Sequence, residues 1–157
     1  MLEFDVKISA GDLYDYNLKH TFSQPINLIA EVLGVVGCAY GISSGQPMAI
    51  AIGALLVVYL PLTLFLRSSQ AAMLPAFRQP LHYRLDEEGL TVTQGEMSES
   101  CKWENMVKAV STSRSILLYT SRVGATIFPR KQIGDGQSAL IQVISEHLPP
   151  AKVRIRS

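Results

Sequence analysis

The feature that most constrains this chain is a long run, from Val32 to Leu66, that contains no Asp, Glu, Lys or Arg. A helix needs only about 20 apolar residues to cross the hydrocarbon core of a bilayer, so this region has room for two passes. Two buried core helices of a soluble protein are the alternative. A chain of 157 residues is too short, however, to cover two helices that are apolar on every side. We therefore predict a transmembrane helical hairpin.

The hairpin is divided by a cluster of Gly, Ser and Pro at residues 41–47, which is typical of a tight connection. We place the first helix at about residues 22–42. The second helix begins with a proline, which suits the first turn of a helix, and occupies about residues 47–66 before Arg67. The predicted hairpin as a whole covers residues 21–67.

The orientation of the hairpin follows from the Lys and Arg residues near its ends. Lys19 precedes the first helix, Arg67 and Arg78 follow the second, and the connection has neither residue type. Because positively charged flanks stay on the cytoplasmic side, we expect both termini to be cytoplasmic. The acidic segment Met1–Phe22 lacks the basic and apolar regions of a signal peptide, so we expect the first helix to be retained.

Small residues follow one face of each predicted helix. Gly34, Gly37 and Gly41 alternate at steps of three and four in the first helix, and Ala49 and Gly53 form a similar pair in the second. Such faces let two helix backbones approach closely. The pattern predicts either packing within the hairpin or an interface between two copies of the chain.

Glu31 is the one ionisable residue within the predicted spans, and a residue of this kind is a functional candidate by default. In an antiparallel hairpin the start of the first helix lies beside the end of the second. Arg67 is therefore the expected partner of Glu31. A structural ion pair and a proton or ion pathway remain the two interpretations.

The remainder of the chain alternates in the manner of strands. Residues 81–128 form short alternating runs separated by turn residues, which predict six strands, and residues 2–8 predict an early strand that pairs with them. Residues 140–148 follow helical spacing and stop at two prolines. This is the element order of a pleckstrin-homology-like (PH-like) domain.

The predicted fold class is therefore an α+β membrane protein. Its transmembrane α-helical hairpin is inserted after the first strand of a PH-like seven-stranded β-barrel or sandwich with a C-terminal helix. The predicted segments are an N-terminal strand with a short helix or turn (1–20), the hairpin (21–67), a linker (68–80), the β-domain with its closing helix (81–149) and a basic tail (150–157).

Five short motifs carry a resemblance to a known family. They are Gly11–Tyr16, Tyr83–Leu90, Trp103–Lys108, Leu118–Ser121 and Ile127–Lys131. Together with the two spans, they resemble the YcxB-like family of small bacterial membrane proteins, which have a PH-like cytoplasmic domain. The resemblance implies a location in the bacterial inner (plasma) membrane and supplies no mechanism. This chain has Pro-Arg-Lys at residues 129–131, where the family often has Pro-Lys-Arg.

The sequence offers no recognisable catalytic arrangement. His20, His82 and His147 are scattered, and no spacing matches a zinc site, a phosphate-binding loop or a nucleophile elbow. We therefore expect neither an enzyme nor a metal or other cofactor.

Basic residues are the best candidates for contact with a partner. The main candidates are Arg130, Lys131, Lys152, Arg154 and Arg156, and two further basic residues, Lys102 and Lys108, flank Trp103. Facing the cytoplasmic leaflet, each adds about 1 kcal/mol of attraction to anionic lipid. Ordinary surface charge is the alternative. Nucleic-acid binding is not expected, because acidic residues are interleaved with the basic ones and no series of aromatic residues is available for stacking.

Three functions fit these features. The first is a noncatalytic adaptor that is anchored in the membrane and binds a protein partner or anionic lipid headgroups. The second is an immunity protein that blocks a membrane-acting toxin. The third is an accessory subunit of a transporter, or a small oligomeric channel, with Glu31 and the glycine face at a helix interface. Besides the bilayer, the expected partner is another protein or a second copy of this chain.

Overall fold

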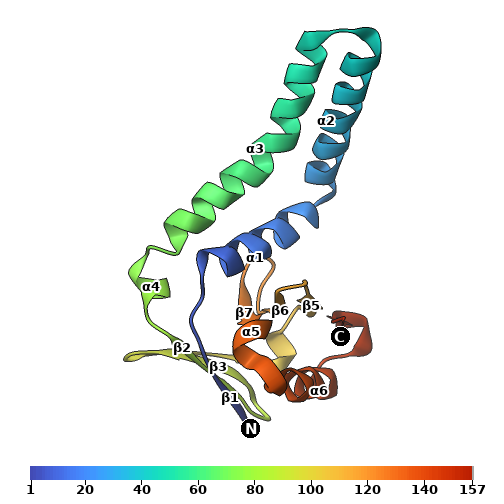
Figure 1. Cartoon of the computed structure of the whole chain (residues 1–157). Helices are drawn as coiled ribbons and strands as arrows, with labels where there is room; N and C mark the ends of the chain where they lie inside the picture. Colours follow the sequence, from blue (N-terminus) through green and yellow to red (C-terminus); the bar gives the residue numbers. More distant parts are fainter. Residues whose placement is uncertain (157) are drawn as a thin grey trace.

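The computed structural model describes residues 1–156 and has a helical hairpin that projects from a domain of two β-sheets (Figure 1). The helices are α1 (Ala10–Phe22), α2 (Pro25–Ser44), α3 (Pro47–Ala71), α4 (Pro75–Arg78), α5 (Arg130–Ile133) and α6 (Gln137–His147). Short 3-10 turns are η1 (Trp103–Asn105), η2 (Gly134–Gly136) and η3 (Pro150–Lys152). The predicted α+β class is confirmed.

Each sheet has four strands. The first sheet contains β1 (Leu2–Val6), β2 (Leu81–Leu85), β3 (Gly89–Gln94) and β4 (Met97–Lys102), paired antiparallel in this order. The second contains β5 (Lys108–Ser111), β6 (Ser115–Tyr119), β7 (Ala125–Pro129) and β8 (Val153–Arg154) in the order β7-β6-β5-β8. Strand β8 runs parallel to β5, and the other pairs in this sheet are antiparallel.

The early strand pairs with the later sheet, as the alternation of residues 2–8 predicts. Strand β1 lies beside β2, with Leu2 opposite Leu85 and Val6 opposite Leu81. The hairpin is thus an insertion between two strands that are neighbours in space. Because β1 leads into α1, the Val6 end of the first sheet lies toward the hairpin and the Leu2 end lies away from it (Figure 1).

The predicted number of strands is wrong, because residues 1–156 contain eight strands rather than seven. Of the two predicted arrangements, a barrel or a sandwich, the closed barrel is excluded, because the strands form two separate sheets. The chain leaves the first sheet at η1, where the Trp103 indole donates a hydrogen bond to the Asp86 carbonyl over 2.8 Å. The additional strand, β8, has only two residues, which is too short to produce a recognisable alternation.

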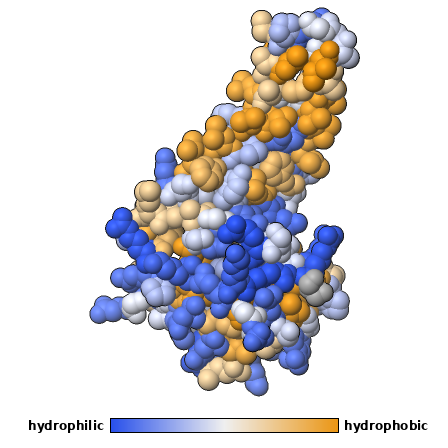
Figure 2. All heavy atoms as spheres, viewed as in Figure 1, coloured by the Kyte–Doolittle hydropathy of each residue, from blue (hydrophilic) through white to orange (hydrophobic). Residues whose placement is uncertain are grey.

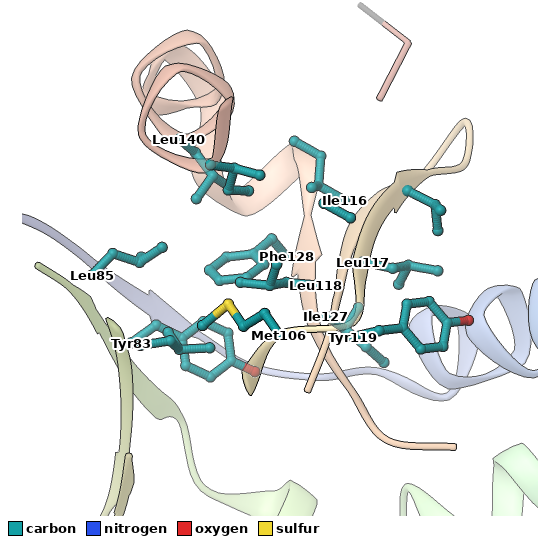
Figure 3. Close-up of a cluster of buried hydrophobic side chains, with 14 of the residues drawn as sticks. Tyr83, Leu85, Met106, Ile116, Leu117, Leu118, Tyr119, Ile127, Phe128 and Leu140 are labelled. Atoms are coloured by element: carbon teal, nitrogen blue, oxygen red, sulfur yellow. The ribbon is translucent and has the colours of Figure 1, made fainter. Parts of the chain in front are cut away.

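The core of the domain lies between the two sheets and α6 (Figure 3). Phe128 of β7 is fully buried, and its ring packs edge-on against Tyr83 of β2 with 5.0 Å between the centroids. Leu140 and Ile144 of α6 are also fully buried. Full burial of a side chain of this size contributes about 1.5–3 kcal/mol, so α6 closes the domain as the helical spacing predicts.

The hairpin helices expose their apolar side chains (Figure 2). Helix α2 has 20 residues and α3 has 25, which correspond to about 30 Å and 37 Å. Ile26 is 68% exposed and Leu55 is 66% exposed. The chain therefore has two helices long and apolar enough to cross a membrane, and its own domain does not cover them.

The predicted linker at residues 68–80 is largely helical. Helix α3 continues four residues beyond Arg67 to Ala71, and residues Pro75–Arg78 form α4. The side-chain amide of Gln94, at the end of β3, donates to the Ala76 carbonyl over 2.6 Å. The second hairpin helix is thereby connected to the first sheet through an ordered segment.

Candidate functional site

Helix α1 positions the hairpin relative to the β-domain, and its first turn is fixed by a capping box. The Asp12 carboxylate accepts a hydrogen bond from the Ser9 backbone amide over 3.0 Å. In return, the Ser9 hydroxyl accepts one from the Asp12 amide over 3.3 Å. Because this reciprocal pair satisfies two free amides, it defines where the helix begins.

One side of α1 packs against the second hairpin helix. The Asn17 side-chain amide donates to the Ser68 hydroxyl over 2.9 Å, and Ser68 is completely buried. The Tyr14 ring meets Phe65 edge-on at 5.7 Å between centroids. These contacts hold the last turns of α3 beside α1.

Another side of α1 packs against the second sheet. The Tyr16 hydroxyl donates to the Val123 carbonyl, and the Tyr16 ring lies 6.2 Å from the ring of Tyr119. The Thr112 hydroxyl donates to the Asp15 carboxylate. Burial, followed by the neighbouring Tyr16, raises the pKa of Tyr119 to about 12. Helix α1 therefore contacts both the hairpin and the β-domain.

A hollow with a volume of about 880 Å³ lies where the C-terminal end of α1 meets the second sheet. Its cationic side chains are Lys19, Lys108, Arg130, Arg154 and Arg156. We call this feature the basic hollow. Lys19 lies six residues before Pro25, so the basic hollow adjoins the start of the apolar helix α2. Figure 2 shows hydrophilic side chains gathered where the hairpin meets the domain.

Hydroxyl groups complete the wall of the basic hollow. They belong to Ser23, Ser111, Thr112 and Ser113. Within residues 1–156, no carboxylate lines the hollow. The nearby Asp15 carboxylate accepts a hydrogen bond from the hydroxyl of Thr112, which is part of the wall. Three of the four hydroxyls already donate within the chain: Ser23 to the Lys19 carbonyl, Ser111 to the Arg156 carbonyl and Thr112 to Asp15. The anion-binding chemistry of the lining therefore lies in its positive charge.

The C-terminal segment supplies one side of the basic hollow. Strand β8 pairs with β5 through Val153 and Arg154. Beyond it, the Arg156 amide donates to the Ser111 hydroxyl over 2.7 Å. The Arg130 guanidinium donates to the Arg156 carbonyl and, over 2.9 Å, to the Gln137 side chain. The Nε atom of Arg130 is buried and has no hydrogen-bond partner among the described residues.

Of the five predicted basic contact residues, three line the basic hollow: Arg130, Arg154 and Arg156. The other two do not. Lys131 is exposed on α5, and the Lys152 ammonium donates to the Met106 carbonyl over 3.0 Å. The sequence interpretation did not include Lys19 in this group and noted Lys108 only as a basic residue near Trp103. The Lys108 ammonium lies 4.7 Å from the ring centroid of Tyr119, its partner on the neighbouring strand β6.

The glycine face of the first hairpin helix packs against the second, as one of its two interpretations predicts. A Cβ atom at Gly34 would lie 3.0 Å from the Gly53 carbonyl oxygen, and one at Gly41 would lie 2.6 Å from Ile50 Cγ1. A Cβ at Gly37 would meet Gly53 Cα at 3.5 Å, which is ordinary contact. The face is thus occupied within one chain.

The predicted pairing of Glu31 with Arg67 is wrong. Arg67 is exposed, and no ion pair joins the two residues in the part of the chain that the structure describes. Gly34, one turn after Glu31, already lies against Val57, so Arg67 is about two turns too far along α3. The prediction did not foresee that α1 packs beside the end of α3. The Oε1 atom of Glu31 is buried without a partner among residues 1–156.

Metal ligation finds no support in the arrangement of side chains. Residues 1–156 contain no group of three or more His, Cys, Asp or Glu residues placed to hold a metal ion.

Comparison with known proteins gives one match. Residues 85–144 match the family model described as YcxB-like protein, a range that extends from the end of β2 into α6. No curated protein and no solved structure matches the chain. The resemblance inferred from the sequence motifs is therefore confirmed for this part of the β-domain.

Proposed function

Because residues 85–144 match the YcxB-like family model, we propose that this chain is a noncatalytic adaptor anchored in the bacterial inner membrane. Its hairpin crosses the bilayer, and both termini and the β-domain are cytoplasmic. The domain acts by binding a target at the membrane surface. The target is an anionic group, because the cations of the basic hollow are gathered beside the hairpin.

The distribution of charge around the hairpin supports this orientation. Lys19, Arg67 and Arg78 lie at the end of the hairpin that joins the β-domain, whereas the tip between α2 and α3 has no Lys or Arg. By the positive-inside rule, the end that carries these charges is cytoplasmic. The tip is then the only part of the hairpin that faces the opposite side.

The proposed domain type is PH-like. The domain has two mainly antiparallel sheets followed by a closing helix, α6. This is the element order expected for such a domain. The open edge at β4 and the short parallel strand β8 are departures from a closed barrel. An experimental structure of the domain tests this assignment directly.

The observation that carries the proposal is the double contact of α1. One helix holds α3 through Asn17 and Ser68 and holds the second sheet through Tyr16 and Tyr119. A domain fixed in this way is not free to rotate away from the membrane surface. The anchor therefore determines which face of the domain meets the target.

A photo-crosslinking experiment in the native membrane tests the proposal. A photoreactive amino acid replaces Ser113, on the wall of the basic hollow, or Glu87, in the turn after β2. We expect a reproducible adduct from position 113 and none from position 87, with mass spectrometry identifying the adduct as lipid or protein. Absence of an adduct from both positions, or adducts only between copies of this chain, contradicts an adaptor.

Glu31 favours a second candidate function, that of an accessory subunit of a transporter. Its buried Oε1 atom lacks a hydrogen-bond partner within residues 1–156, and such an atom is costly in an apolar environment. Because this atom has no exposed surface, a neighbouring membrane protein would contact Glu31 through the rest of its half-buried carboxylate. In that case Glu31→Gln weakens co-purification of a membrane partner, whereas Tyr40→Phe, an exposed position on the same helix, leaves it unchanged. Equal behaviour of the two variants contradicts this candidate.

A further inference from the structure

We propose that the basic hollow binds the phosphate headgroup of an anionic phospholipid from the leaflet at the base of the hairpin. This inference rests on the proposed function for the position of the hollow at the membrane. It goes further by naming the ligand class and the residues that select it. The selecting residues are the five cations Lys19, Lys108, Arg130, Arg154 and Arg156.

The first argument is charge. Five cations line one hollow without an intervening carboxylate in the described chain, so they repel one another when the hollow contains only water. A phosphate group removes this repulsion. Arginine is well suited to the task, because its planar guanidinium binds two phosphate oxygens at once. The Arg130 guanidinium already donates to Gln137 and to the Arg156 carbonyl, so Arg130 contributes to the hollow mainly through its charge.

The second argument is the size of the hollow. Its volume of about 880 Å³ lies near the upper end of the range of about 300–1,000 Å³ that is common for ligand pockets. A single inorganic phosphate leaves most of this space empty. A headgroup that carries a phosphate and a polar alcohol fills more of it.

The third argument is the position of apolar surface beside the charge. Lys19 and Ser23 line the hollow, and the first turns of α2 begin at Pro25. Ile26 and Ile29 in these turns are 68% and 54% exposed. A ligand with an anionic head and apolar chains matches both surfaces, whereas a soluble phosphate matches only one. The occupant is therefore a lipid.

The fourth argument concerns the C-terminal segment. Arg154 lies on β8, which has only two ladder pairs with β5, and Arg156 follows it. Beyond the strand, Arg156 is held by its contacts with Ser111 and Arg130. A bound anion attracts both arginines and so stabilises this segment in its docked position. Lipid binding and the order of the C-terminal segment are consequently coupled.

Native mass spectrometry of the full chain in a neutral detergent tests the proposal. The protein is titrated with phosphatidylglycerol or with phosphatidylcholine of the same acyl chains. The hollow variant is Lys108→Gln with Arg154→Gln and Arg156→Gln. The matched control, Lys7→Gln with Lys102→Gln and Lys131→Gln, removes the same charge from exposed residues outside the hollow.

We expect the wild type to bind phosphatidylglycerol at least about tenfold more tightly than phosphatidylcholine. Three lost charges at about 1 kcal/mol each predict a loss of about a hundredfold in the hollow variant, and the control keeps the wild-type preference. Equal binding by wild type and hollow variant overturns the proposal, as does an equal loss in the control. If the triple variant does not fold, Arg154→Gln alone and the wild-type lipid preference decide the question.

Two competition measurements distinguish a lipid from other anions as the ligand of the hollow. Soluble glycerol 3-phosphate is expected not to displace phosphatidylglycerol at equal concentration, because it lacks apolar chains. Displacement by this compound, or by an acidic peptide, overturns a lipid site. Because these measurements are made in detergent, they do not depend on the orientation of the protein in the membrane. Failure of the adaptor proposal and failure of the lipid site are therefore distinguishable.

Discussion

Asn17 of α1 donates a hydrogen bond to the hydroxyl of Ser68 in α3 over 2.9 Å, at a position where Ser68 has no exposed surface. This contact lies on the side of α1 that packs against the hairpin. On another side, Tyr16 contacts the second sheet. The Asn17–Ser68 pair thus belongs to the connection that fixes the β-domain relative to the hairpin.

Loss of this contact loosens the junction. Asn17→Ala leaves the buried Ser68 hydroxyl without its donor, and we expect the free energy of unfolding to fall by about 1 kcal/mol or more. Limited proteolysis after Arg67 should become faster, because the last turns of α3 lose support. Asn105→Ala, at an exposed position in η1, is the control. Unchanged proteolysis of the Asn17 variant would show that the junction does not depend on this pair.

Helix packing in the hairpin depends on Gly53. A Cβ atom there would lie 2.6 Å from both the Cys38 amide nitrogen and the Gly34 carbonyl oxygen. Gly53→Val therefore forces the helices apart, and we expect a loss of about 1–3 kcal/mol, measured by thermal unfolding in detergent. Ala54→Val, at the neighbouring exposed position, should have little effect. Similar melting temperatures for the two variants would contradict the observed helix contact.

Trp103 joins η1 to the turn after β2. Its indole donates to the Asp86 carbonyl, and its ring stacks on His147 of α6 with 4.7 Å between centroids. We expect Trp103→Phe to destabilise the domain by about 1–3 kcal/mol, because the Asp86 carbonyl loses its donor. In the wild type, emission of this single tryptophan should be poorly quenched by iodide, since the residue is buried. Strong quenching in the folded protein would show that the residue is accessible.

Tyr119 predicts a loss of stability in alkaline solution. Burial and the neighbouring Tyr16 raise its pKa from 10.0 to about 12. The contribution of Tyr119 to the free energy of unfolding is complete below pH 10, because the residue is then protonated in both the folded and the unfolded chain. Between about pH 10 and 12 the unfolded chain loses the proton first, so stability falls as the pH rises.

The free energy of unfolding, measured from pH 9 to 12, tests this prediction. The free energy of unfolding of the Tyr119→Phe variant should decrease less steeply with pH than that of the wild type. Tyr40→Phe, an exposed position on α2, should retain the wild-type slope. Parallel profiles for the wild type and the Tyr119 variant would exclude Tyr119 as the source of the effect.

The parts of the fold that were predictable depend on local patterns. Absence of charge from Val32 to Leu66 indicated the hairpin, and alternation indicated β1 and its pairing with the later strands. The glycine spacing indicated a close helix contact because every third or fourth residue lies on one face. These signals are contained in a few turns of helix or a single strand.

The parts that were not predictable depend on contacts between distant residues. Gly34 lies against Val57, so Arg67 is about two turns too far along α3 to reach Glu31, and α1 packs beside that end of α3 instead. Strand β8 is defined by its pairing with β5 rather than by its own two residues. The basic residues near the C-terminus were recognisable as candidates from the sequence. Their association with Lys19 and Lys108 was not, because it depends on the fold.

The central claim is that α1 holds the side of the domain with the basic hollow against the membrane. A variant with Cys38 and Cys101 replaced by alanine carries one fluorescent label at Ser113→Cys or Glu87→Cys. Ser113 lines the hollow, whereas Glu87 follows the Leu85 end of β2, which lies away from the hairpin (Figure 1). Energy transfer to an acceptor on lipid headgroups is measured in proteoliposomes. The account predicts much stronger transfer from position 113; equal transfer, or stronger transfer from position 87, would contradict it.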